Sequence, residues 1–161
     1  MAFPIPSKRR LLAAFALATA FSGSAMAAGS VEMQVEHLVK QAMAEYNTAM
    51  ETSDSASFAK YFASNATFET PTARYSGRKD IAKYFESEFK TFKATYDVKK
   101  MLVQGSSAAI VITWDGVDRT SGDALKVEMV GVYEVGSSGQ FSAARYYYDS
   151  AKAKALADLG K

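Results

Sequence analysis

After Lys93 the chain consists of long β-like stretches that are separated by short turns rich in glycine and serine. Long strands joined by such short turns pair with their neighbours, because a parallel arrangement needs much longer connections. The pattern therefore predicts an antiparallel meander as the centre of the fold. The four stretches span residues 95–103, 108–118, 125–135 and 141–149.

The segments before the meander have the periodicity of amphipathic helices. Apolar side chains recur every three or four residues from Val31 to Met50, and Ser53-Asp54-Ser55 breaks this helix and can cap a second, short one. A third helix follows Gly77 and carries an aromatic stripe that only Glu88 interrupts. Such a stripe is typical of a helix face that packs on a sheet.

A last alanine-rich piece, residues 150–159, predicts a short C-terminal helix that ends at Gly160. The order of elements gives an α+β fold over residues 31–158, in which a curved antiparallel sheet packs against three N-terminal helices. Neither an internal repeat nor a low-complexity linker divides this domain.

Residues 1–27 have the organisation of a cleaved bacterial signal peptide. A basic segment precedes the apolar run 11–21, and Ala25-Met26-Ala27 fits a small-x-small cleavage site. The run is short of the roughly 20 residues that a membrane-spanning helix needs, so a retained anchor is the less favoured alternative. We expect a periplasmic or secreted protein without a membrane span after cleavage. The pair Arg9-Arg10 leaves Sec and twin-arginine export both open.

Composition excludes several kinds of chemistry. The 161 residues contain no Cys and a single His, which argues against thiolate catalysis, disulfides, a Ser/His/Asp triad and a multi-His metal site. Cleavage after residue 27 removes three of the 19 basic residues and none of the 17 acidic ones, which leaves a net charge of about −1. The precursor's positive charge therefore gives no reason to expect nucleic-acid binding. We expect neither a metal nor a cofactor.

The stretch 125–135 is apolar on both faces in its middle. Val127 and Met129 lie on one face, and Val130 and Val132 lie on the other. The helices can cover only one of these faces. A second subunit is the expected cover of the other, which predicts a homodimer through the convex face of the sheet.

The order of several short phrases resembles a known family. These are Tyr46 on the first helix, FASNATFETP at 62–71, YSGRKDI at 75–81, GVY at 131–133 and RYYYD at 145–149. Together they are similar to SnoaL-like members of the nuclear-transport-factor-2-like superfamily, to which ketosteroid isomerase also belongs. The resemblance implies a cone-shaped sheet that closes around a pocket.

The resemblance also implies which side chains line that pocket. They would form a deep and mostly apolar cavity with hydroxyl groups at intervals, which suits a small apolar or aromatic molecule. Besides Tyr46, the residues carried over as pocket lining are Met50, Phe68, Thr70, Tyr84, Ile112, Trp114, Met129, Tyr133, Tyr146 and Tyr148.

The catalytic sets of the family's enzymes are incomplete in this chain. Relative to ketosteroid isomerase, Tyr46 is retained, but Thr70 and Gly131 stand where the two acids would be. Relative to limonene-epoxide-hydrolase-like members, Gly116 replaces an arginine, and Asp118 matches one of two acids.

Asp118 and Tyr46 are the catalytic candidates that remain. Each has a structural alternative: Asp118 lies at a hairpin end, where Asp often serves the turn, and Tyr46 could be a core residue. His37 falls off the apolar stripe of its helix, so we expect it to be an exposed bystander.

Three hypotheses follow, and the sequence leaves open whether the protein is an enzyme. The first is an exported binder of a small hydrophobic molecule. The second is an isomerase, cyclase or lyase that uses Asp118 and pocket tyrosines. The third is a dimeric interaction module. If the interior is collapsed and filled by Trp114, Tyr133 and Tyr146, both small-molecule hypotheses fail and this third one leads.

Overall fold

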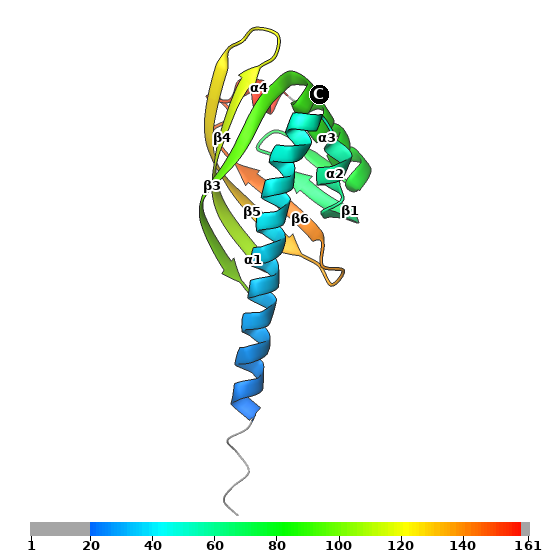
Figure 1. The fold of residues 1–161 in the computed structure, drawn as a ribbon, viewed down its shortest axis with the longest axis vertical. Helices are drawn as coiled ribbons and strands as arrows, with labels where there is room; N and C mark the ends of the chain where they lie inside the picture. The colour runs from blue at the N-terminus through cyan, green and yellow to red at the C-terminus, as the bar shows by residue number, and fades with distance from the viewer. Residues whose placement is uncertain (1–19, 159–161) are drawn as a thin grey trace, which may run out of the picture.

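The computed structural model describes residues 20–158 and shows a curved six-stranded sheet with helices packed against one face (Figure 1). The helices are α1 (Ala20–Thr52), α2 (Ser55–Ala59), α3 (Arg78–Thr91) and α4 (Lys154–Ala157). The strands are β1 (Phe62–Glu69), β2 (Arg74–Ser76), β3 (Phe92–Gln104), β4 (Ser107–Asp118), β5 (Ala124–Val135) and β6 (Phe141–Tyr147). The predicted α+β fold with three N-terminal helices and a short C-terminal one is confirmed.

The strands lie in the order β2-β1-β6-β5-β4-β3. From β3 to β6 each strand pairs antiparallel with the next, which confirms the predicted meander. β1 instead runs parallel to β6, with Phe68 opposite Ala144. β2, which the sequence did not predict, forms a short antiparallel pair with β1 and is the edge of the sheet.

α1 lies across the sheet and packs against β3 and β4, while α3 packs against β1, β2 and β3 (Figure 1). The buried face of α1 includes Val35, Val39, Ala42, Tyr46 and Met50, which have at most 2% of their surface exposed. Four of these five positions belong to the predicted apolar stripe, in agreement with the 3.6-residue period. Val31 of that stripe is instead 40% exposed, and Leu38 is only partly buried. The helix is longer than the predicted 31–50 at both ends.

The predicted signal peptide lies outside the described residues up to residue 19. Residues 20–27, its last part, are helical and continue into the rest of α1. In the part of the chain that the structure describes, none of the helices combines the length and apolar character needed to cross a membrane.

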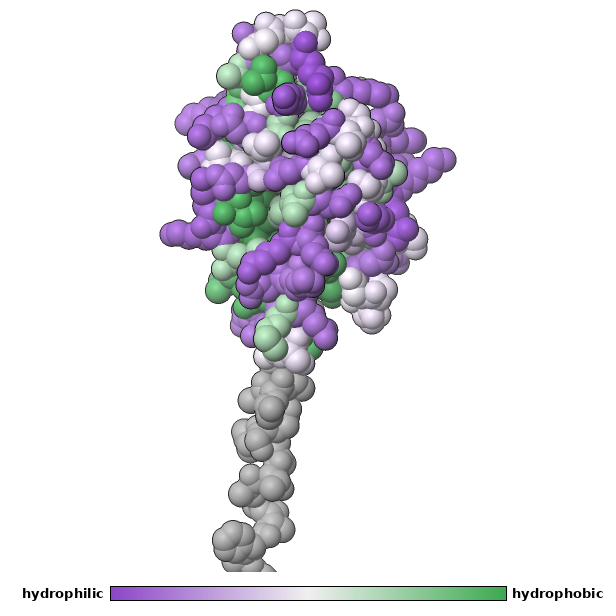
Figure 2. Space-filling model, viewed as in Figure 1, coloured by the Kyte–Doolittle hydropathy of each residue, from purple (hydrophilic) through white to green (hydrophobic). Residues whose placement is uncertain are grey.

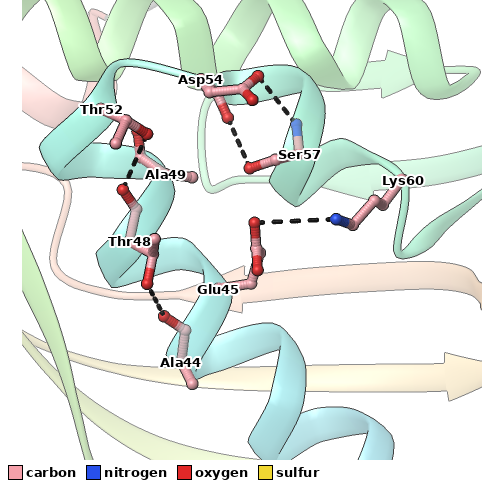
Figure 3. Close-up of polar contacts among 8 residues, drawn as sticks. All are labelled: Ala44, Glu45, Thr48, Ala49, Thr52, Asp54, Ser57 and Lys60. Carbon is pink, nitrogen blue, oxygen red and sulfur yellow. Dashed lines mark hydrogen bonds and ion pairs between the residues drawn. The ribbon is translucent and has the colours of Figure 1, made fainter.

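The turn from α1 into α2 depends on local hydrogen bonds (Figure 3). The side chain of Asp54 accepts the backbone N–H of Ser57, which caps α2 as predicted. Ser53 adopts a positive φ of 57°, so the helix ends in the left-handed conformation that commonly terminates helices. Lys60 then forms an ion pair with Glu45 of α1, at 3.9 Å.

α3 begins after Gly77, whose φ of 84° is the conformation that glycine adopts most readily. Along this helix the residues of the predicted stripe are buried against the sheet and α2, and so is the acidic residue that interrupts them. Its buried residues are Ile81, Tyr84, Phe85, Glu88 and Phe89.

The two sides of the sheet differ in cover. The side seen with α1 in front is mainly hydrophilic, with hydrophobic side chains in separate spots (Figure 2). The other face of the sheet carries a cross-strand row in which Val111 is opposite Val130 and Val130 is opposite Tyr147. These three side chains are 37%, 38% and 56% exposed.

Candidate functional site

Three elements bring polar side chains together inside the cone. α1 contributes Tyr46, α3 contributes Glu88 and β4 contributes Trp114. Each points inward because it occupies the buried stripe of its helix or the inner face of its strand. At most 1% of the surface of any of the three is exposed.

Both donors of this group meet the same oxygen atom. The hydroxyl of Tyr46 donates to Oε1 of Glu88 at 2.5 Å, and the indole Nε1 of Trp114 donates to Oε1 at 2.8 Å. Nε1 is also 3.1 Å from the Tyr46 hydroxyl oxygen. The other carboxyl oxygen, Oε2, is buried and has no hydrogen-bond partner among residues 20–158. Two hydrogen bonds therefore hold Oε1 in place, whereas Oε2 remains available to a further donor.

Burial raises the pKa of Glu88 to about 7, although the hydrogen bonds from Tyr46 and Trp114 work in the opposite direction. The two donors stabilise the charged carboxylate, whereas removal from water destabilises it. At neutral pH the group is therefore present in both its protonated and ionised forms. A carboxyl group in this condition can give or take a proton.

Aromatic rings surround the carboxyl group. Tyr96 stacks on Tyr46 at 3.7 Å, and Phe89 meets Tyr46 edge-on at 5.5 Å. Burial raises the pKa values of Tyr84 and Tyr96, and the negative charge of Glu88 raises them further. These phenols therefore stay protonated at any ordinary pH and remain hydrogen-bond donors.

A second polar pair lies on β5 and β6. The hydroxyl oxygens of Tyr133 and Tyr146 are 2.7 Å apart, and the Tyr133 hydroxyl also lies 4.0 Å from the sulfur of Met43. Both tyrosines are buried, with 0% and 3% of their surface exposed. The interior thus contains two separate hydrogen-bonded groups rather than one.

Two glycines lie directly against interior aromatic rings. A Cβ at Gly116 would lie 2.2 Å from the Trp114 ring, and a Cβ at Gly131 would lie 2.9 Å from the Tyr133 ring. In this chain aromatic rings occupy the space where side chains at positions 116 and 131 would be. A larger side chain at either position would require these rings to move.

The structure brings most of the predicted pocket residues into one buried cluster. Tyr148 packs against this cluster and Thr70 is half-buried at its margin. The aromatic rings fill the interior, since Tyr46, Trp114 and Tyr133 have no exposed surface. The predicted residues within the cluster are Tyr46, Met50, Phe68, Tyr84, Ile112, Trp114, Met129, Tyr133 and Tyr146.

Asp118 is not part of this cluster; it is the last residue of β4, next to the turn that follows. Its side chain accepts the backbone N–H groups of Thr120 and Ser121, at 2.7 and 2.9 Å. These bonds lower the pKa of Asp118. The geometry is that of a turn residue, which was the structural alternative for this position. Catalysis by Asp118 stays a prediction.

His37 lies on the exposed side of α1 and lines a surface groove of about 570 Å³. The groove runs between the N-terminal half of α1 and the turns that contain Ser106 and Gly136. Its walls hold Val35 and Leu38. Across the described residues, no group of three or more His, Cys, Asp or Glu side chains could hold a metal ion.

Sequence reasoning missed Glu88 as a site residue. The available signal was its place in the stripe of α3, where a charged residue stands at a position that must be buried. Charged residues are almost never fully buried unless they are paired. This signal identifies an unusual carboxyl group, although it does not reveal the partners.

The fold and the buried carboxyl define a class of protein, an α+β cone of the nuclear-transport-factor-2-like type with a polar group inside. A SnoaL-like polyketide cyclase from Jannaschia sp. CCS1 is 14% identical, with a TM-score of 0.68 over 81% of this chain and 96% of that one. A nuclear-transport-factor-2-like protein from Burkholderia xenovorans LB400 is 14% identical, with a TM-score of 0.64 over 79% and 98%.

A third solved structure has a ketosteroid-isomerase-like fold and was determined in complex with trimethylamine. It comes from Catenulispora acidiphila DSM 44928 and is 15% identical, with a TM-score of 0.62 over 73% of this chain and 92% of that one. A search of curated proteins finds no match. Residues 43–144 match the model of the SnoaL-like domain. The chain belongs to the SnoaL-like domain family.

Proposed function

We propose that the interior site around Glu88 takes up a small, mainly apolar molecule that carries one hydrogen-bonding oxygen. The observation that supports this is the Oε2 atom, which is buried without a partner in the described part of the chain while Oε1 receives two donors. Buried polar atoms are nearly always paired, so an unpaired one points to a missing partner. The aromatic surroundings suit the apolar part of such a molecule.

The filled interior sets a condition on this proposal. Tyr46, Trp114 and Tyr133 leave no exposed surface, so a ligand enters only when side chains move aside. By the criterion of the sequence analysis, this filling counts against both small-molecule hypotheses and favours the interaction module. An interaction module does not account for the unpaired carboxyl oxygen of Glu88 in the core. We therefore propose the small-molecule function first.

Native mass spectrometry of the exported protein tests this function. We expect a small molecule to co-purify with the wild-type chain, and Glu88→Gln to reduce its retention at least tenfold, which corresponds to about one lost hydrogen bond to a charged group. Glu86→Gln is the matched control, since Glu86 lies on the same helix but is exposed and paired with Lys90. A wild-type protein that retains no molecule and binds none of a panel of aromatic ketones and phenols contradicts the proposal.

Acid–base catalysis at the same site is the enzymatic form of this proposal. One solved relative is described as a polyketide cyclase, and Glu88 has the protonation behaviour that proton transfer needs. Glu88 would carry the proton, with Tyr46 as a hydrogen-bond donor. With an identified substrate, loss of turnover in Glu88→Gln but not in Asp118→Asn supports it. The reverse result would assign the chemistry to Asp118.

A homodimer through the outer face of the sheet is a second proposal. The exposed row of Val111, Val130 and Tyr147 supports it, because such a row of apolar side chains is poorly placed in water. Val130→Glu should convert the dimer into a monomer in light scattering. Met33→Glu changes an exposed apolar residue of α1 and should leave the dimer intact. A wild-type monomer at micromolar concentration excludes this proposal.

Export to the periplasm or the medium is a third proposal, which depends on residues 1–27. The intact mass of the protein from a periplasmic extract should correspond to a chain that begins at Ala28. Replacement of Arg9 and Arg10 by lysine should stop export by the twin-arginine route but not by Sec. A retained N-terminus in the membrane fraction would instead show an anchor.

A further inference from the structure

Gly116 lies beneath the indole ring of Trp114, two residues further along the same face of β4. A Cβ at Gly116 would lie 2.2 Å from Cη2, 2.6 Å from Cζ3 and 2.8 Å from Cζ2 of that ring. Atoms do not approach this closely, so the ring keeps its position only while residue 116 is glycine. Gly116 is not among the glycines with positive φ, and the requirement is therefore one of space.

The position of the ring determines how the carboxyl group of Glu88 is held. With the indole lying across Gly116, Nε1 reaches Oε1 of Glu88 at 2.8 Å. The hydroxyl of Tyr46 reaches the same oxygen from α1. Two donors on one oxygen orient the carboxyl group and leave Oε2 as the atom available to a partner.

We propose that Gly116 is a positioning residue for Glu88, which it orients through the indole ring of Trp114. Substitution of Gly116 moves the indole, removes one donor from Oε1 and releases the carboxyl group. The role of the oriented Oε2 toward a ligand rests on the proposed function, whereas the orientation itself does not.

Gly131 provides a matched comparison on the neighbouring strand. A Cβ there would lie 2.9 Å from Cε2 of Tyr133 and 3.2 Å from Cε1 of Tyr146. It therefore makes room for the tyrosine pair, not for the indole. An alanine at either position disturbs an interior ring, but only the one at position 116 disturbs a donor to Glu88.

The experiment is a pH titration of the Glu88 carboxyl carbon by NMR, in protein labelled at glutamate and without any ligand. Glu88→Gln assigns the signal by removing it. We expect Gly116→Ala to shift the titration midpoint upward by about half a pH unit or more, because the lost N–H donor had stabilised the charged form. Gly131→Ala should leave the midpoint unchanged. Trp114→Phe, which keeps Gly116 and removes the N–H donor together with part of the indole ring system, should also shift the midpoint upward.

Epistasis completes the test. In a double variant with Gly116→Ala and Trp114→Phe, the midpoint should move no further than in Trp114→Phe alone, because both changes remove the same donor. An unchanged midpoint in Gly116→Ala, or an equal shift in Gly131→Ala, overturns the proposal. If Gly116→Ala does not fold, an unchanged midpoint in Trp114→Phe overturns it. Because no ligand is present, failure of the ligand-binding proposal does not affect these results.

Discussion

Glu88 and Asp118 are two carboxyl groups with opposite environments. Asp118 is the last residue of β4, where two backbone N–H groups of the following turn bind its side chain and lower its pKa. Glu88 is inside the cone, where burial raises its pKa despite two donors. The comparison shows that hydrogen bonds alone do not decide the charge of a carboxyl group. Access to water decides it here, and only the buried group is unusual enough to suggest a function.

The largest expected effect on stability comes from Glu88→Ala. This change leaves the Tyr46 hydroxyl without its acceptor, leaves the Trp114 N–H with only the Tyr46 oxygen, and opens a cavity in the core. We expect a loss of about 2–4 kcal/mol in the free energy of unfolding at pH 5, measured with urea. Asp118→Ala should cost clearly less, since water can replace its contacts. An equal loss of stability in the two variants would mean that the buried carboxyl group contributes no more to stability than the turn residue Asp118.

The pH dependence of stability gives the next largest effect. The folded-state pKa of Glu88 is about 7 and the ordinary value is 4.5, so the unfolded chain releases its proton first as the pH rises. The stability that the protonated group contributes is therefore complete below about pH 4.5 and is lost as the pH rises through 7. The total change is roughly 3 kcal/mol.

Urea unfolding between pH 4.5 and 8 measures this dependence. Glu88→Gln should flatten the curve in that range, because glutamine does not titrate. Asp118→Asn should leave the decline in place, since the lowered pKa of Asp118 affects stability only at more acidic pH. A decline that persists in Glu88→Gln would show that another group is responsible.

Tyr46→Phe has a smaller expected effect. It removes one hydrogen bond to Glu88 and keeps the ring that stacks on Tyr96. We expect a loss of about 1–2 kcal/mol at pH 8, where the charged carboxylate needs its donors most, and less at pH 5. Equal losses at the two pH values would indicate that the hydroxyl serves packing rather than the carboxylate.

The smallest effect belongs to Asp118→Asn. Asparagine has an oxygen that can accept the same backbone N–H groups, so the turn should persist. We expect no change in ligand retention and only a slight change in melting temperature, measured by calorimetry. A loss of ligand retention comparable to that of Glu88→Gln would restore Asp118 as a site residue.

The sequence predicted the fold well because long periodic elements leave little choice. The apolar stripe of α1 and the alternation of side chains around Val127 and Met129 identify the buried face of the helix and of the strand. Neither pattern requires knowledge of tertiary contacts. β2 was missed because three residues, Arg74–Ser76, are too few to show a period. Its pairing depends on the register with β1, which no local pattern reports.

The site was harder to predict than the fold. Tyr46 and Trp114 were recognised as interior residues, but their convergence on Glu88 depends on the relative position of α1, α3 and β4. The sequence favoured Asp118 because the alternation of side chains along the strand places it on the same face as Trp114. Its hydrogen-bond partners, Thr120 and Ser121, lie beyond the end of the strand, where this alternation no longer applies. The charged Glu88 within the aromatic stripe of α3 was the better guide to the site. The free-energy cost of burying a charged side chain does not depend on how the strands are aligned.

The parallel pairing of β1 with β6 has a consequence for the order of folding. Phe62 is opposite Phe141 in the sheet, so strands from near the two ends of the domain lie side by side. The meander from β3 to β6 can form from local hairpins, but β1 and β2, which pair with each other, join the rest of the sheet only through β6. Contacts so distant in sequence form slowly. The cone therefore closes last, and a chain that still lacks residues 141–147 remains an open half-sheet.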